Sequence, residues 1–167
     1  MGRDILGSAQ TGTGKTASFT LPMIDILASG RAKARMPRSL ILAPTRELAA
    51  QVSESFKKFS VNHKMSMALL IGGVSFSEQD AALSKGVDVL IATPGRLLDH
   101  FERGKVLLQD VKILVIDEAD RMLDMGFIPD VERIVSFLPV MRQTLFFSAT
   151  LSAVSYTHLT LPTSLIV

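Results

Sequence analysis

Glycine, lysine and threonine follow one another in the segment AQTGTGKT, residues 9–16, in a pattern that could bind phosphate. The glycines let backbone N–H groups surround phosphate oxygens, Lys15 adds a cation, and the Thr16 hydroxyl can ligate magnesium. The segment matches the end of the GxxxxGK-Ser/Thr pattern, although Ala9 stands where the strict pattern has glycine. An apolar run before the segment and a helix after it favour a nucleotide site over a glycine-rich turn with an incidental Lys-Thr pair.

A second group of reactive side chains, Asp117-Glu118-Ala119-Asp120, directly follows the apolar run Ile113–Ile116. Acids at this position would emerge at the carboxyl edge of a parallel sheet, where ligand sites of α/β proteins form. Asp117 is suited to hold magnesium through water, and Glu118 could activate the attacking water as a general base. Asp120 is left to couple the site to another part of the molecule. The alternative is that these acids only favour a helix start, an effect of about 0.3–1 kcal/mol each.

Three further loops follow predicted strands and would lie on the same edge of the sheet. They are Pro44-Thr45-Arg46-Glu47-Leu48-Ala49, Gly72-Gly73 and Thr93-Pro94-Gly95-Arg96. Two of them place a hydroxyl and an arginine at a helix start, where free N–H groups can bind the phosphates of a nucleic acid strand. Each loop alone could be nothing more than a capped helix start.

Short apolar runs alternate with helical patterns and would position these loops. The runs are Ile5-Leu6, Leu40–Ala43, Ala68–Ile71, Val89–Ala92, Ile113–Ile116 and Leu145–Phe147. Their continuous hydrophobicity predicts parallel strands that are buried on both faces between layers of helices. Apolar stripes indicate helices around Leu48–Phe59 and Val131–Leu138, and we expect Thr93 and Asp130 to cap helices.

Composition narrows the class of protein. The 167 residues predict one domain, and the net charge of +2 permits nucleic acid as a partner without requiring it. Cysteine is absent and the three histidines are scattered, so we expect no metal site apart from a magnesium that arrives with the nucleotide. No apolar run is long enough to span a bilayer, which predicts a cytoplasmic protein. We interpret the basic segment Gly30–Arg38 as a solvated connection.

Taken together, these segments resemble the DEAD-box RNA helicase family, whose motifs AQTGTGKT, PTRELA, GG, TPGR, DEAD and SAT occur here in the family's order. The segments GRDILGSAQTGTGKTASFTLP and DEADRMLDMGF look most like those of the bacterial RhlE-type branch. The resemblance implies a RecA-like P-loop NTPase domain, a parallel β-sheet flanked by helices on both faces. It also implies ATP, Mg²⁺ and RNA as ligands, with the RNA held by its backbone and without sequence preference.

The resemblance also assigns roles to individual residues. The implied ATP-binding residues are Ala9, Gln10, Thr11, Gly12, Thr13, Gly14, Lys15 and Thr16, with Thr16 and Asp117 at the metal and Lys15, Asp117 and Glu118 catalytic. The implied RNA-binding residues are Pro44, Thr45, Arg46, Glu47, Gly72, Gly73, Thr93, Pro94, Gly95 and Arg96. The implied coupling residues, which would link hydrolysis to strand separation, are Asp120, Ser148, Ala149 and Thr150.

The sequence departs from the family at both ends. We expect residues 1–152 to form the ATP-binding domain, incomplete at its N-terminus because the segment that reads adenine is missing. We interpret residues 153–167 as a non-native tail. We expect the second RecA-like domain and its arginines to be absent, and we therefore expect the chain, a monomer, to bind nucleotide but barely hydrolyse it. A non-catalytic nucleotide- or RNA-binding module and a DNA-directed P-loop helicase are the alternatives.

Overall fold

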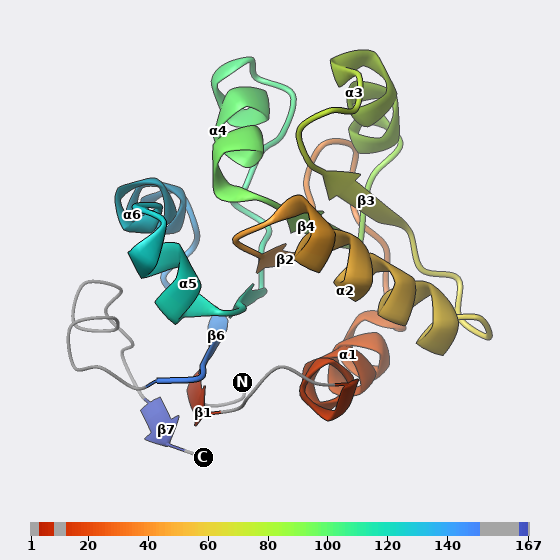
Figure 1. The fold of residues 1–167 in the computed structure, drawn as a ribbon. Helices are drawn as coiled ribbons and strands as arrows, with labels where there is room; N and C mark the ends of the chain where they lie inside the picture. Colours follow the sequence, from red (N-terminus) through yellow and green to blue (C-terminus); the bar gives the residue numbers. More distant parts are fainter. Residues whose placement is uncertain (1–3, 9–12, 151–163, 167) are drawn as a thin grey trace.

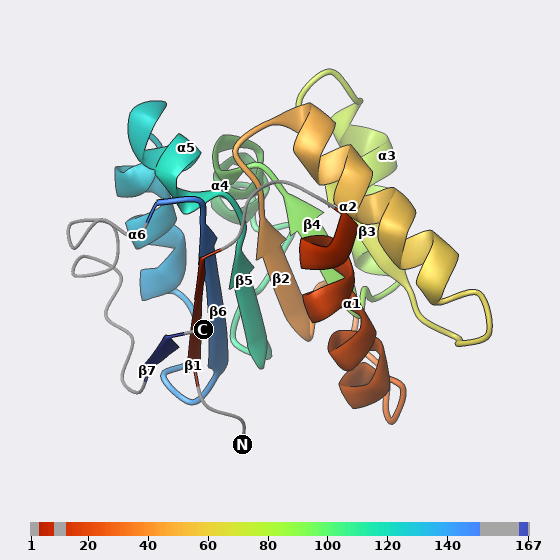
Figure 2. The same cartoon turned by 60° about the horizontal axis from the view of Figure 1, so that its bottom comes forward.

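The sheet is the organising element of the computed structural model, which describes residues 4–8, 13–150 and 164–166. Its strands lie in the order β3-β4-β2-β5-β6-β1-β7, and every pairing between them is parallel (Figure 2). The strands are β1 (Asp4–Ser8), β2 (Ser39–Leu42), β3 (Met67–Leu70), β4 (Val89–Ala92), β5 (Ile113–Ile116), β6 (Gln143–Ser148) and β7 (Ser164–Ile166). The predicted parallel α/β fold is confirmed, with the six predicted strands displaced by only a few residues at their ends.

Helices cover both faces of this sheet (Figures 1 and 2). They are α1 (Thr13–Leu27), α2 (Arg46–Phe59), α3 (Phe76–Ser84), α4 (Pro94–Glu102), α5 (Ala119–Asp124) and α6 (Ile128–Ser136). Residues of α1 and α2 share one buried apolar cluster, whereas residues of α3 to α6 share the other. None of the helices in the described ranges is long and apolar enough to cross a membrane.

Alternating side chains of the central strands supply both clusters, which explains the continuous apolar runs. In β2, Leu40 and Leu42 lie in the cluster beneath α3 to α6, while Ile41 lies in the cluster beneath α1 and α2. All three are fully buried. Because successive side chains of a strand point to opposite faces, a strand covered on both sides needs apolar residues at every position.

The two predicted helix caps have different outcomes. Thr93 occupies the predicted cap position of α4, but its side chain makes no capping hydrogen bond. Asp130 lies inside the first turn of α6, whose cap residue is Phe127. By contrast, the Oγ1 of Thr45 accepts a hydrogen bond from the N–H of Leu48 at 3.2 Å and caps α2.

The basic segment Gly30–Arg38 is solvated only in part. The guanidinium of Arg38 is mostly buried, lies 3.4 Å from Asp88 Oδ1 and donates to the carbonyl of Leu27. Asp88 in turn accepts a hydrogen bond from the N–H of Ala32 at 2.9 Å. The end of this connection is therefore fixed to the start of β4, a role that its sequence did not indicate.

Candidate nucleotide site and nucleic-acid interface

Lys15, Asp117 and Glu118 meet at the carboxyl edge of the sheet. Lys15 lies in the first turn of α1 after β1, and the two acids directly follow β5. The Lys15 Nζ is 2.8 Å from Asp117 Oδ1 and 3.7 Å from Glu118 Oε1. The side chains of Lys15 and Asp117 are only 5% and 1% exposed. The predicted phosphate-loop lysine and the predicted acids therefore form one buried charged cluster.

Asp117 carries the most unusual electrostatics in this cluster. Burial raises the pKa of its carboxyl group, and the neighbouring Lys15 ammonium opposes that rise. Apart from this ion pair, both carboxylate oxygens are buried without a hydrogen-bond partner, and so is Glu118 Oε1. Buried carboxylate oxygens of this kind are costly unless a cation or a bound ligand satisfies them. The cluster is therefore arranged to receive positive charge.

Glu118 adopts a left-handed backbone conformation, with φ of +52° and ψ of +54°. This conformation costs a residue other than glycine roughly 1–2 kcal/mol. Hydrogen bonds on both sides hold it: the Asp117 N–H donates to the carbonyl of Leu42 at 3.0 Å, and the Met122 N–H donates to the Glu118 carbonyl at 3.2 Å. Arg121 Nη1 lies 3.1 Å from Glu118 Oε2. The strained turn keeps the carboxylate of Glu118 beside Lys15.

The donor set fits a nucleotide-borne magnesium. Asp117 presents buried oxygens, which a hard cation prefers, and Thr16 follows Lys15 in the first turn of α1. Within the described part of the chain, no group of three or more histidine, cysteine or acidic residues could hold a metal by itself. A metal would therefore need ligands from the nucleotide and water as well.

The other members of the predicted phosphate loop are only partly described. Residues 9–12 (Ala9, Gln10, Thr11 and Gly12) lie outside the described residues. Thr13 begins α1, and Gly14 follows it with open space where a Cβ would be. The prediction for the loop itself stays a prediction.

The predicted coupling residues lie between the two halves of the cluster. Ser148 ends β6, which pairs with β1 on one side and with β5 on the other. It is buried, and its hydroxyl donates to the carbonyl of Thr150 at 2.7 Å. Ala149 and Thr150 are exposed, and Asp120 is half-buried in the first turn of α5.

The predicted nucleic-acid loops are brought together on the same edge. Backbone hydrogen bonds connect them in series: Asp117 donates to Leu42, Ala43 to Ala92, and Thr93 to Leu70. A pocket of about 400 Å³ lies between them, and its lining consists of Pro44, Thr45, Arg46, Gly72, Thr93, Arg96, Asp99, Met125 and Phe127. Glu47, Gly73, Pro94 and Gly95 flank this pocket in sequence but do not line it.

Arg46 extends towards the two glycines. A Cβ placed on Gly73, whose φ is +82°, would lie 2.7 Å from Arg46 Nη1, so a larger residue would displace the guanidinium. At Gly72 and Gly95 an added Cβ would meet nothing within 4 Å, which leaves room for a ligand to approach the backbone. The two arginines and Asp99 give the pocket lining a net positive charge suited to phosphate.

Sequence reasoning missed Met125 and Phe127, which form the apolar side of this pocket. Met125 is 46% exposed. The signal was present in the sequence, since both residues closely follow the acidic motif. Their position opposite Thr45 and Arg96 depends on the short α5, which turns the chain back over the sheet edge.

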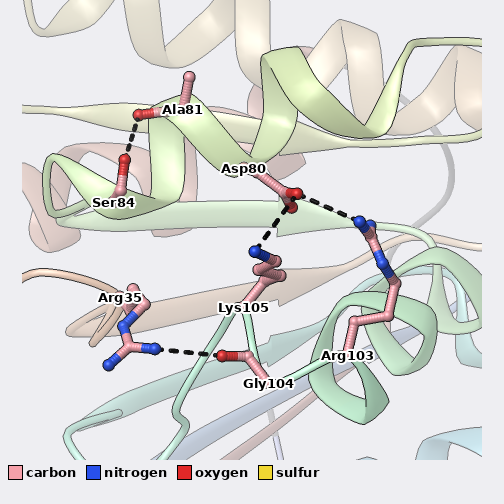
Figure 3. Close-up of a pocket in the computed structure, with 7 residues that line it drawn as sticks. All are labelled: Arg35, Asp80, Ala81, Ser84, Arg103, Gly104 and Lys105. Atoms are coloured by element: carbon pink, nitrogen blue, oxygen red, sulfur yellow. Dashed lines mark hydrogen bonds and ion pairs between the residues drawn. The ribbon is translucent and has the colours of Figure 1, made fainter.

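A second pocket, of about 490 Å³, contains none of the predicted site residues. In Figure 3 the carboxylate of Asp80 points towards both Arg103 and Lys105, at 3.3 and 4.0 Å. Arg35 donates to the carbonyl of Gly104 on the other side of this pocket. The lining of this second pocket is also net positive, with Arg35, Arg103 and Lys105 against Asp80, but no residue of the predicted nucleic-acid loops belongs to it.

A parallel α/β sheet that carries a buried lysine and an Asp-Glu pair on one edge defines the class of phosphate-loop nucleotide-binding proteins. The sequence profile of the DEAD/DEAH box helicase family matches residues 1–158. The chain therefore belongs to the DEAD/DEAH box helicase family.

Named relatives agree with this assignment. A "DEAD-box ATP-dependent RNA helicase 52A" of Oryza sativa subsp. japonica is 48% identical, with 89% of this chain and 28% of that protein covered. The "ATP-dependent RNA helicase CshA" of Listeria monocytogenes is 49% identical, with 90% and 28% covered. The chain thus spans little more than a quarter of the length of these relatives. Plant and bacterial proteins match similarly well, so the RhlE-type branch stays a prediction.

A solved structure shares the fold. The crystal structure of a DEAD box protein from the hyperthermophile Methanococcus jannaschii superimposes with a TM-score of 0.89 at 36% identity. The superposition covers 99% of this chain and 45% of that one. The RecA-like fold expected from the sequence is confirmed.

Proposed function

We propose that this chain is the ATP-binding part of an ATP-dependent RNA helicase, which couples ATP hydrolysis to local unwinding or remodelling of RNA. The observation that supports this proposal most is the buried cluster of Lys15, Asp117 and Glu118 on the same sheet edge as the basic pocket. One edge thus carries groups for a nucleotide and groups for a phosphate backbone. The names of the relatives point in the same direction.

In the nucleotide site, Lys15 would bind the β- and γ-phosphates, and this contact would take its charge away from Asp117. Asp117 and the hydroxyl of Thr16 would then hold Mg²⁺, which neutralises phosphate charge when bound. Glu118 would orient and deprotonate the attacking water, because its carboxylate is fixed next to the lysine. Residues 9–14 would wrap the phosphates with their backbone N–H groups.

In the pocket, Arg46 and Arg96 would contact RNA phosphates, and Gly72 and Gly95 would allow the strand to approach closely. Contacts of this kind carry no base information, so binding would not depend on sequence. Asp120 and Ser148-Ala149-Thr150 would transmit the state of the nucleotide, since Ser148 lies on the strand between the lysine and the acids. We propose a cytoplasmic monomer as the working unit.

A second RecA-like domain would supply arginines to the γ-phosphate. An arginine of this type contributes roughly 10³–10⁵ in turnover, or about 4–7 kcal/mol of barrier. The chain alone should therefore bind ATP and release phosphate very slowly. This expectation leaves a non-catalytic nucleotide- or RNA-binding module as the alternative for the isolated chain.

Phosphate release with and without RNA distinguishes these possibilities. We expect weak release by the chain alone and strong RNA-stimulated release when a second RecA-like domain is joined to it. In the joined protein, Glu118→Gln should leave ATP affinity intact and abolish release, whereas Lys15→Ala should weaken ATP binding. Equal loss of ATP binding in both variants would contradict the assigned roles.

The choice of nucleic acid is tested separately. RNA and DNA single strands of equal length should be compared as stimulators of the joined protein at one salt concentration. We expect RNA to stimulate more strongly. Stronger stimulation by DNA would favour the alternative of a DNA-directed P-loop helicase.

A further inference from the structure

Gln79 is a buried polar residue of α3 to which no motif assigns a role. It is only 4% exposed. Its side-chain nitrogen donates to the carbonyls of Leu69 and Ile71, at 3.4 and 2.9 Å. These carbonyls belong to β3 and the residue after it, and β3 is an edge strand that has no strand on its outer side among the described residues. The two carbonyls therefore fix which way the Gln79 amide faces.

The oxygen of the same amide faces α4. Gln79 Oε1 accepts from Arg96 Nε at 2.9 Å and lies 2.7 Å from His100 Nε2. Because an amide has two N–H donors and two acceptor lone pairs, every hydrogen-bonding position of Gln79 is used. This one side chain thus connects the sheet edge to the arginine of the TPGR loop.

Arg96 is held from three directions. Besides Gln79, Arg96 Nη2 donates to the carbonyl of Val74, and the guanidinium carbon lies 3.5 Å from the centroid of the Phe76 ring. A guanidinium has five N–H donors, so these bonds leave donors of its planar group for a ligand. Arg96 also lines the pocket between the motif loops. Its position in that pocket is set by α3 and the loop before it.

His100 contacts both Gln79 and Asp80. It is fully buried, and its Nδ1 lies 3.1 Å from Asp80 Oδ1 while its Nε2 faces Gln79. Because Gln79 Oε1 is an acceptor, this contact is a hydrogen bond in the forms of His100 that carry a proton on Nε2. Asp80 is in turn paired with Arg103 and Lys105 (Figure 3). Gln79 therefore sits at the centre of a network that ends on Arg96.

We propose that Gln79 is a positioning residue that holds Arg96 in the geometry needed to contact an RNA phosphate. The inference rests on the proposed RNA-binding function, because it gives Arg96 its ligand. Gln79 itself does not line the pocket and carries no charge, and Arg96 is the charged pocket residue to which it is hydrogen-bonded, so its effect on the salt dependence of RNA binding should pass through Arg96.

The test measures the affinity of the chain for a fluorescein-labelled single-stranded RNA by anisotropy across a series of salt concentrations. Arg96→Ala should lower the slope of log affinity against log salt by about 0.7, the value for one phosphate contact on a single strand. Gln79→Met keeps the length of the side chain and changes no charge, yet it should lower the slope in the same way. Affinity at fixed salt should fall roughly tenfold in both variants.

A double substitution separates positioning from general damage. In the Arg96→Ala background, Gln79→Met should change RNA affinity less than about twofold, because the residue it positions is gone. Gln79→Glu keeps acceptor oxygens for Arg96 and should retain more RNA affinity than Gln79→Met. Gln51→Met, on an exposed position of α2, is the matched control and should leave the salt slope unchanged.

Thermal unfolding identifies variants that do not fold. If Gln79→Met does not fold, Gln79→Asn replaces it with the same expectation, because asparagine withdraws the amide oxygen by one methylene. An unchanged slope in the folded Gln79 variant, alongside a lowered slope in Arg96→Ala, overturns the positioning role alone. A wild-type chain that binds no RNA overturns the proposed function together with this inference.

Discussion

Replacing Lys15 by methionine should destabilise the ligand-free chain, because the substitution leaves Asp117 buried without its cation. Methionine keeps the length of the side chain, so the change removes charge rather than packing. The Asp117 side chain is 1% exposed, and among the described residues Lys15 is the cation in ion-pair contact with it. Breaking a buried pair in this way costs about 3–5 kcal/mol.

An exposed pair provides the matched control. Lys57 Nζ lies 3.0 Å from Glu54 Oε1, close to the 2.8 Å of the buried pair, but the two side chains are 60% and 73% exposed. Exposed helical pairs contribute only about 0.3–0.5 kcal/mol, so Lys57→Met should barely change the free energy of unfolding. Urea unfolding of both variants at pH 7 compares the two costs directly.

Two further measurements locate the cost at Asp117. Burial raises the pKa of this carboxyl group, so the folded chain keeps the proton to a higher pH than the unfolded chain does. Ionisation of Asp117 then lowers the free energy of unfolding as the pH rises through this pKa. The free energy of unfolding that Lys15→Met loses relative to the wild-type chain should therefore be smaller at lower pH. Adding Asp117→Asn should restore most of the stability at pH 7. If Lys15→Met lowers the free energy of unfolding no more than Lys57→Met does, the buried ion pair does not have the expected cost. If Asp117→Asn restores none of the lost free energy of unfolding, the cost does not arise at Asp117.

Three other predictions concern helix capping, backbone strain and protonation. Thr45→Ala should lower the free energy of unfolding in urea by about 1 kcal/mol. Thr93→Ala should lower it by less, because the Thr93 side chain makes no cap hydrogen bond. Equal losses in the two variants would show that the cap hydrogen bond is not the cause. Glu118→Gly should be more stable than Glu118→Ala by about 1 kcal/mol, since only glycine adopts φ of +52° without strain, and the opposite order would argue against strain at this turn. Burial lowers the pKa of His100 below its ordinary 6.5, and the neighbouring Asp80 carboxylate opposes this shift. As the pH drops below 6.5, the unfolded chain therefore takes up the proton before the folded chain does, and the free energy of unfolding falls. His100→Asn should flatten this part of the stability curve, and an unchanged curve would contradict the assignment.

The strands and the edge that carries the site could be predicted from sequence because burial on both faces leaves a direct pattern. Val89–Ala92 and Ile113–Ile116 are strands with the predicted bounds, since every position in them is covered. The parallel arrangement then places residues after β1 and β5 on one edge. The sequence alone therefore predicts that Lys15 lies near Asp117.

The parts that could not be predicted depend on tertiary contacts. Gln79 has no pattern of its own, and its role arises only because β3 lies at the edge of the sheet and leaves carbonyls to satisfy. The left-handed backbone of Glu118 runs against the preference of glutamate, so only its place in the fold imposes it. Asp130 does not cap α6, because propensity indicates which residue can cap a helix and not where the helix begins.

The place of β1 in the sheet has a consequence for how the chain folds during synthesis. β1 is synthesised well before its partner β6. The buried carboxylate of Asp4 accepts its hydrogen bond from Thr144, 140 residues further along. β1 must therefore wait, with apolar Leu6 uncovered, until β6 has emerged. Nucleotide binding, which needs Lys15 beside Asp117, would then report that β6 has been inserted next to β1.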